Sequence, residues 1–238
     1  METLPIPLET GFIFILILAI IWFLDGLGVI AWIAVIIVFL MVCKSWEINK
    51  DFQYEHSGLG PVHGWEYLKR NIWRAQWRRY FWECLKKDLL IRFIAFVVFW
   101  FILEFVRRLY EPFLIISKNI LWRFPLSILS YYPWALFQQV ILNGYFTNRI
   151  SKFVTSPIKV SLIAGIIFAI VHWPNPVLVP VTFVGGMMSA YFFQRSKNVY
   201  TLALLHVFLA VYLLYFFPDA WHRHLTIGPG FDRWEPRN

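Results

Sequence analysis

The sequence predicts an all-α membrane protein, a polytopic helix bundle of about seven transmembrane helices with an additional interfacial amphipathic helix. Of the 238 residues, 59% are hydrophobic and only 15% are charged, whereas soluble domains carry about 25% charged residues. The apolar residues are gathered into blocks without Asp, Glu, Lys or Arg, namely 11–24, 27–43, 124–148, 160–194 and 198–218. Because a transmembrane helix needs roughly 17–25 mostly apolar residues, these blocks have room for the whole bundle and none for a separate soluble domain.

The first two spans, 11–24 and 27–43, meet at Asp25 and Gly26, a turn signal that predicts a tight helical hairpin. The later spans are expected over 89–106, 125–146, 158–172, 176–194 and 199–217, with a polar tail over 218–238. Small residues recur every fourth position in the fifth and sixth spans, which predicts seams where helices pack closely. They are Ser161, Gly165 and Ala169, then Gly185 with Ser189, and Gly186 with Ala190.

The long polar stretch 44–88 is expected to form the interfacial helix. Residues 69–92 contain eight Lys or Arg against two Asp or Glu, and Trp73, Trp77 and Phe81 recur every fourth residue on one helix face. Aromatic residues beside Lys and Arg are favoured in the headgroup layer of a membrane. The net charge of +8 therefore indicates a bilayer partner and not a nucleic acid.

Polar side chains interrupt three of the apolar spans, and the set comprises Gln138, Gln139, Asn143, His172 and His206. On a helix, Gln139 and Asn143 lie one turn apart on the same face. Hydrogen bonding between helices would explain an isolated group, at about 0.6–2 kcal/mol each. Several such groups on three spans indicate a functional site, because polar and ionisable residues inside a membrane are costly.

These residues fall in three motifs, which are Gln138-Gln139-Val-Ile-Leu-Asn143-Gly144, Phe168-Ala-Ile-Val-His172-Trp-Pro174-Asn175-Pro176, and His206-Val-Phe-Leu-Ala210. Their order, spacing and membrane placement resemble the CAAX protease and bacteriocin-processing family of glutamic-type intramembrane endopeptidases. In that family the motifs are Glu-Glu-x-x-x-Arg, Phe-x-x-x-His with a Pro-Asn-Pro-like turn, and His-x-x-x-Asn. The resemblance implies a helical membrane fold and peptide hydrolysis.

The resemblance further implies a glutamate pair that activates water, a first histidine that assists it, and a second histidine that stabilises the oxyanion. His172 and His206 keep the two histidine positions, but both glutamates are glutamines here, the arginine is Asn143, and the last asparagine is Ala210. A primary amide can hold a water but cannot take its proton, and losing a general base usually removes about 10²–10⁴ in rate.

A neutral imidazole is the best base that remains, because burial favours the uncharged ring. We therefore assign His172 as the base, Gln139 as the residue that orients the water, and His206 as the oxyanion donor. Gln138 and Asn143 complete the candidate catalytic set. Replacing two carboxylates and a guanidinium together also avoids an unpaired buried ion in the motif.

The tail holds a His-x-His pair, His222 and His224, close to Asp219. Such a pair can bind a divalent metal when a third ligand is near. If the tail covered the cavity, these two residues could join His172 and His206 in a four-histidine metal site. The spacing favours the plainer interpretation of a pH-sensitive cluster at headgroup level, and no other cofactor is expected.

Three functions stay open. The preferred one is an intramembrane endopeptidase with altered catalytic residues that hydrolyses a membrane-embedded or prenylated peptide. The second is a pseudo-protease that holds a peptide or an isoprenoid lipid without cutting it. The third is a histidine–metal enzyme of lipid or isoprenoid metabolism. In each case the expected partners are the bilayer and an apolar substrate, and the expected location is a bacterial inner membrane.

Overall fold

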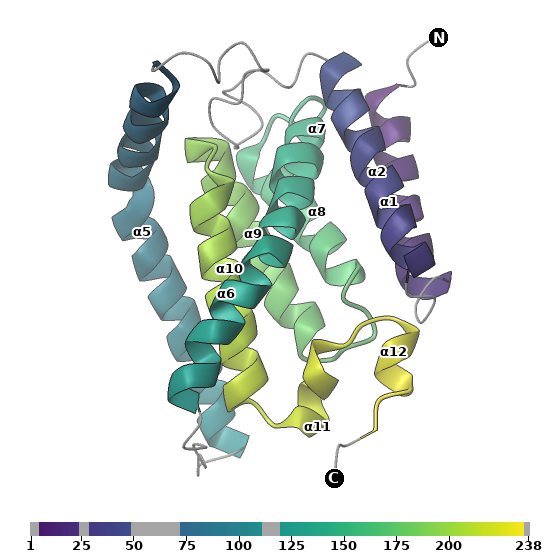
Figure 1. Ribbon diagram of the computed structural model, residues 1–238, viewed down its shortest axis with the longest axis vertical. Helices are drawn as coiled ribbons and strands as arrows, with labels where there is room; N and C mark the ends of the chain where they lie inside the picture. The colour runs from purple at the N-terminus through teal and green to yellow at the C-terminus, as the bar shows by residue number, and fades with distance from the viewer. Residues whose placement is uncertain (1–4, 24–28, 49–71, 111–119, 236–238) are drawn as a thin grey trace.

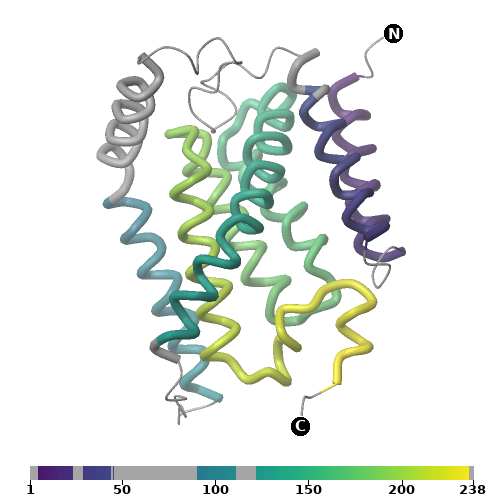
Figure 2. The backbone as a smooth tube through the Cα atoms, in the orientation of Figure 1, coloured from purple at the N-terminus to yellow at the C-terminus, as the bar shows by residue number. Residues whose placement is uncertain are grey.

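The computed structural model describes residues 5–23, 29–48, 72–110 and 120–235 (Figures 1 and 2). In this part of the chain every regular element is a helix, which confirms the predicted all-α fold. The elements are α1 (Ile6–Phe23), α2 (Val29–Ile48), α5 (Ile72–Tyr110), α6 (Ile120–Gln139), the π-helix η1 (Val140–Thr147), α7 (Asn148–Ile150), α8 (Pro157–Ile170), α9 (Leu178–Ser196), α10 (Val199–Phe216), α11 (Asp219–His222), the 3₁₀ turn η2 (Arg223–Leu225) and α12 (Pro229–Asp232).

Each expected span overlaps one or two helices, while the turn expected at Asp25 and Gly26 lies outside the described residues. By length and composition α1 and α10 could cross a membrane, while Val29–Cys43 and Pro157–Ile170 are shorter apolar helices. Large apolar side chains are exposed along α1, α2 and α5. Such faces are stable against lipid tails and costly against water, so the outside of the bundle suits a bilayer. The number of spans stays a prediction.

The interfacial segment differs from its prediction. Residues 49–71 lie outside the described residues, and 72–88 continue without a break into the third span as α5. At about 1.5 Å per residue, the 39 residues of α5 span roughly 58 Å, about twice the thickness of the hydrocarbon core. The expected third span and residues 72–88 therefore form one helix that is longer than the apolar layer of a membrane is thick.

The centre of the bundle is built from two helix pairs, α8 with α9 and α6 with α10 (Figure 1). A Cβ at Gly165 would lie 2.7 Å from the carbonyl oxygen of Phe183, and one at Gly186 would lie 3.0 Å from Phe168 Cβ. The predicted close packing of these two helices is thus observed. It brings the aromatic ring of Phe168 against α9.

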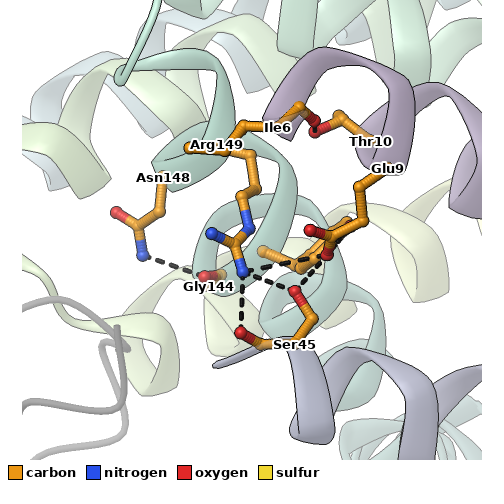
Figure 3. A network of polar contacts seen from close by, with 8 residues as sticks. Ile6, Glu9, Thr10, Ser45, Gly144, Asn148 and Arg149 are labelled. Carbon is orange, nitrogen blue, oxygen red and sulfur yellow. Dashed lines mark hydrogen bonds and ion pairs between the residues drawn. The ribbon is translucent and has the colours of Figure 1, made fainter. Parts of the chain in front are cut away.

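A buried ion pair attaches the N-terminal hairpin to this centre (Figure 3). Arg149 of α7 is 1% exposed, and its Nη2 lies 3.8 Å from Glu9 Oε1 and 3.0 Å from the carbonyl oxygen of Ser45. The hydroxyls of Ser45 and Tyr145 donate to the same carboxylate. Because a buried guanidinium needs such partners, this network fixes α1 and α2 against the end of η1.

The C-terminal tail crosses one end of the helix bundle (Figure 1). Hydrogen bonds from Asn175 hold it there. Its Nδ2 donates to the carbonyl oxygens of His222, at 2.8 Å, and Thr226, at 3.0 Å. Its Oδ1 accepts from the backbone N–H groups of Val177 and Leu178, which begin the next helix. The Pro-Asn-Pro turn therefore both starts α9 and holds the tail.

Gly228 brings the tail close to α1. Its φ is +57°, and a Cβ there would lie 2.9 Å from Ile21 Cγ2. Its N–H donates to the carbonyl oxygen of Trp173 at 2.8 Å. Glycine is favoured here because it tolerates both the left-handed backbone and the close approach. The preceding Leu225 and Ile227 then line one end of the internal cavity.

Candidate active site

The polar residues of the first motif lie where α6 passes into η1. Gln139 is the last residue of α6, and Asn143 and Thr147 follow at four-residue intervals within the π-helix. The Thr147 hydroxyl lies 3.0 Å from the Leu142 carbonyl oxygen, five residues back, and 3.3 Å from Asn143 Oδ1. The result is one buried polar stripe. π-Helical turns are rare and frequently occur at functional sites.

Hydrogen bonds fix the orientation of the Gln139 amide. Its Oε1 accepts from Asn143 Nδ2 at 2.6 Å and from the Ser189 hydroxyl of α9 at 2.6 Å. Its Nε2 is therefore the atom that faces His206, 3.2 Å from Nδ1. An amide nitrogen can only donate, so Nδ1 accepts and the proton of the neutral His206 ring lies on Nε2.

The other cavity histidine carries its proton on the opposite nitrogen. His172 Nδ1 lies 2.6 Å from the carbonyl oxygen of Phe168. A carbonyl oxygen can only accept, so Nδ1 donates and Nε2 keeps its lone pair. The two neutral rings are thus complementary, because His172 offers an acceptor and His206 offers a donor.

Phe168 contacts both imidazoles. Its ring centroid is 4.7 Å from that of His172 and 5.6 Å from that of His206, with interplanar angles of 74° and 86°. These edge-to-face contacts are a favoured geometry for aromatic rings. The packing against Gly186 that positions Phe168 therefore also positions the two histidines.

Both histidines line a cavity of about 290 Å³ inside the bundle. Its walls are mostly apolar and come from the membrane helices, with the tail at one end. Gln138 and Gln139 also line it. Cavities of this size and composition, with a few convergent polar groups, are typical of small-ligand and substrate sites.

Four of the five candidate residues thus line the same cavity, namely Gln138, Gln139, His172 and His206. Asn143 is 0% exposed and instead holds the Gln139 oxygen. The Gln139 oxygen already accepts two hydrogen bonds, while its Nε2 faces His206. Gln138 Nε2 lies 3.5 Å from the Tyr131 hydroxyl. The catalytic roles themselves stay predictions.

The tail histidines are held separately. His222 is 0% exposed, its Nε2 lies 3.0 Å from the Phe217 carbonyl oxygen, and burial lowers its pKa. His224 Nε2 lies 3.3 Å from Asp219 Oδ2. Among the described residues no three His, Cys, Asp or Glu side chains lie close enough to share a metal ion. The four histidines considered for a metal site are therefore not gathered into one group.

The three motif segments were compared with known protein families. Residues 120–212 match the family model described as type II CAAX prenyl endopeptidase Rce1-like. This segment is similar to the Rce1-like family. The match runs from the start of α6 into α10 and includes all three motifs, so the resemblance predicted from the sequence is confirmed over this segment. The similarity supports an integral membrane protein with a segment related to a protease family. Comparisons with curated proteins and with solved structures gave no match.

Sequence reasoning missed two residues of the candidate site. Ser189 was assigned to helix packing because it lies in a row of small residues, yet its hydroxyl bonds to both Gln139 and Asn143. Tyr131 was not singled out, although it precedes Gln138 by seven residues, about two helical turns, and so lies on the same face. That spacing is the signal that could have found it.

Proposed function

We propose that this protein is an intramembrane endopeptidase in which His172 replaces the glutamate pair as general base. The observation that supports the proposal is the complementary proton placement on the two cavity histidines. Hydrolysis of an amide needs a group that accepts the proton of water and a group that donates to the oxyanion. His172 and His206 supply one of each.

The reaction begins with a water hydrogen-bonded to His172 Nε2. His172 takes one proton as the water oxygen attacks the peptide carbonyl carbon, and the developing oxyanion accepts a hydrogen bond from His206 Nε2–H. The protonated His172 then gives that proton to the leaving nitrogen as the C–N bond breaks. The products are a carboxylic acid and an amine, and the histidines return to their starting states.

Gln139 is a positioning residue in this scheme. Its Nε2–H keeps His206 Nδ1 as an acceptor, which keeps the oxyanion-binding proton on the other nitrogen. Asn143 and Ser189 hold Gln139 in turn. The amides that replace the charged motif therefore serve a neutral, histidine-based mechanism.

The proposed substrate is a membrane-embedded or prenylated peptide in a bacterial inner membrane. The mostly apolar cavity supports this choice, because burying an alkyl chain contributes about 0.8 kcal/mol per methylene. A water-soluble peptide without an apolar chain would gain little from such walls. The bilayer would deliver the substrate laterally to the bundle.

The test uses the full chain in detergent micelles with a fluorogenic farnesylated peptide and with a transmembrane peptide. We expect cleavage by the unmodified protein, a loss of at least about 10²-fold in His172→Ala, and no change in His224→Ala, an exposed histidine of the tail. Mass spectrometry of the products identifies the cleaved bond. Equal cleavage by His172→Ala, or none by the unmodified protein, would contradict the proposal.

Binding without cleavage is the second candidate function. It is favoured by one observation, that both motif positions carry glutamine, and a primary amide cannot take a proton from water. In that case the unmodified protein and His172→Ala would bind the farnesylated peptide with the same affinity, and neither would form a product.

A further inference from the structure

Gly185 of α9 is a glycine that helix packing does not explain. Gly165 and Gly186 lie at close contacts between α8 and α9, whereas a Cβ at Gly185 would meet no atom of the described residues within 4 Å beyond its own turn of helix. Inside a helix, glycine is less favourable than alanine. Gly185 lines the internal cavity, so its missing side chain leaves space there for a ligand.

The wall that α9 contributes to the cavity is long. It runs from Leu178 to Phe192, roughly 20 Å along the helix axis, with Gly185 midway. A cavity of about 290 Å³ that follows this wall is narrow. Its shape therefore suits an extended chain better than a compact group.

The hydroxyls on either side of Gly185 are already bonded within the protein. Thr182 Oγ1 donates to a backbone carbonyl oxygen one turn back, at 2.7 Å. The Ser189 hydroxyl donates to Gln139 Oε1 at 2.6 Å and accepts from Asn143 Nδ2 at 2.8 Å. The backbone groups of Gly185 lie in the middle of α9 and bond along the helix. This part of the wall therefore offers neither hydroxyl proton to a ligand and favours an apolar group.

Gly185 is also close to the polar groups of the site. Ser189, which holds the Gln139 amide, follows it by four residues on α9, a rise of about 6 Å. The Gln139 amide in turn orients His206. An apolar chain beside Gly185 is thus about one helical turn from the amide that positions the oxyanion donor.

We propose that Gly185 sets the length of the apolar chain that the cavity accepts. The bare helix backbone lets an isoprenyl chain continue along α9, and a side chain at this position would stop it there. The proposal rests on the proposed function, because His206 marks the place of the peptide carbonyl. The acyl chain of a phospholipid has the same apolar chemistry and is separated from the peptide by the experiment below.

The experiment measures binding to the full chain in detergent micelles, in the His172→Ala background, where the peptide is not consumed. One fluorescent peptide carries a geranyl, a farnesyl or a geranylgeranyl chain, each longer than the one before by an isoprene unit. We expect binding to become tighter as the chain lengthens, because each buried methylene adds affinity. Gly185→Leu removes this gain. All three peptides then bind like the geranyl peptide, and the farnesyl peptide binds at least about tenfold more weakly.

Gly11→Leu is the matched control. Gly11 is also a helix glycine whose Cβ would meet no described atom within 4 Å, but it is exposed on α1 and does not line the cavity. The dependence on chain length should therefore stay intact in this variant.

Gly185→Ala keeps the test decisive even if Gly185→Leu fails to fold. Its melting temperature should equal or exceed that of its parent, because alanine is the better helix former and has room at this position. The geranylgeranyl peptide should bind about fourfold more weakly, since the methyl group takes the space of one carbon.

Several results would overturn the proposal. Equal affinities in Gly185→Leu and Gly11→Leu would do so, as would an equal loss of affinity for all three chains. A lower melting temperature in Gly185→Ala would show that the position is not open. An excess of phosphatidylglycerol should leave the peptide bound, and displacement of the peptide would assign this wall to a lipid acyl chain instead.

The outcomes also separate the role of Gly185 from the proposed function. Cleavage by the unmodified protein, together with a length dependence that Gly185→Leu leaves intact, overturns the role of Gly185 alone. Loss of the length dependence in Gly185→Leu, without any cleavage by the unmodified protein, overturns hydrolysis alone. Failure of all three peptides to bind overturns both.

Discussion

Gln139 and His206 are joined by a 3.2 Å hydrogen bond in which the amide nitrogen donates to the ring Nδ1. The direction of this bond follows from the two donors, Asn143 and Ser189, that occupy the amide oxygen. A glutamate at the same place could only accept when ionised, and would therefore move the ring proton to Nδ1. The exchange of Glu for Gln thus changes the hydrogen-bonding role of the histidine as well as the charge of the motif.

Gln139→Glu tests this relationship. The new carboxylate would turn His206 Nε2 into an acceptor in the neutral ring, so we expect cleavage to fall at least about tenfold, with a lower melting temperature from the buried charge. Activity and thermal unfolding of the purified protein check both. A rise in activity would show that a carboxylate at this position is the better base and would contradict the assignment to His172.

Ser189→Ala tests the support of Gln139 from α9. The change removes a donor to Gln139 and an acceptor for Asn143, and each unsatisfied buried group costs about 1–3 kcal/mol. We expect a lower melting temperature and a kcat lowered several-fold at nearly constant KM, because the amide loses its fixed orientation. Ser130→Ala, an exposed serine of α6, is the matched control. A kcat equal to that of the control would exclude this positioning role.

Asn175→Asp separates the two tasks of the Pro-Asn-Pro turn. Aspartate can still accept from Val177 and Leu178, but it cannot donate to the tail carbonyls of His222 and Thr226. We therefore expect the helices to remain folded while the tail opens, which limited trypsin digestion at Arg223 would detect. Unchanged digestion together with unchanged melting would show that the tail is held by other contacts.

The buried His222 predicts a pH dependence of the tail. Its pKa is lowered, chiefly by burial, so the folded tail favours the neutral ring, while in the open tail the ring titrates near its ordinary value of about 6.5. The tail is therefore most stable above that value and loses stability as the pH falls below it. Asp219 and His224 are the charged or titratable groups close to this ring.

Proteolysis between pH 7 and pH 5 measures this effect. We expect digestion of the tail to increase on acidification in the unmodified protein, and to depend much less on pH in His222→Phe, which fills the same space without a titrating group. His224→Asn controls for the exposed histidine. The same pH response in His222→Phe would assign it to another group.

The helices were predictable because the apolar blocks contain no charged residue and are long enough for helices that cross a membrane. Residues 72–110 form one continuous helix because they contain no Gly or Pro and nothing in that stretch ends a helix. The break that we expected near residue 88 has no such signal in the sequence. Arg92 was counted with the basic belt of the headgroup layer, but the continuous α5 places it against the cavity. A charge count cannot distinguish these two environments.

The residues of the site were more predictable than their roles. The four-residue spacing of Gln139 and Asn143 gave their shared face, and the family motifs gave the histidines. The direction of each hydrogen bond could not be predicted, because the deciding partner of Gln139, Ser189, lies 50 residues away on another helix. The π-helix likewise has no simple sequence signal.

Nitrogen-15 NMR of the imidazole rings in the detergent-solubilised protein measures the proton positions on which the mechanism depends, with signals assigned by His172→Ala and His206→Ala. We expect a neutral His172 that carries its proton on Nδ1 and a neutral His206 that carries its proton on Nε2. If both rings carry the proton on the same nitrogen, or the two assignments are reversed, the complementary base and donor do not exist and the proposed mechanism is wrong.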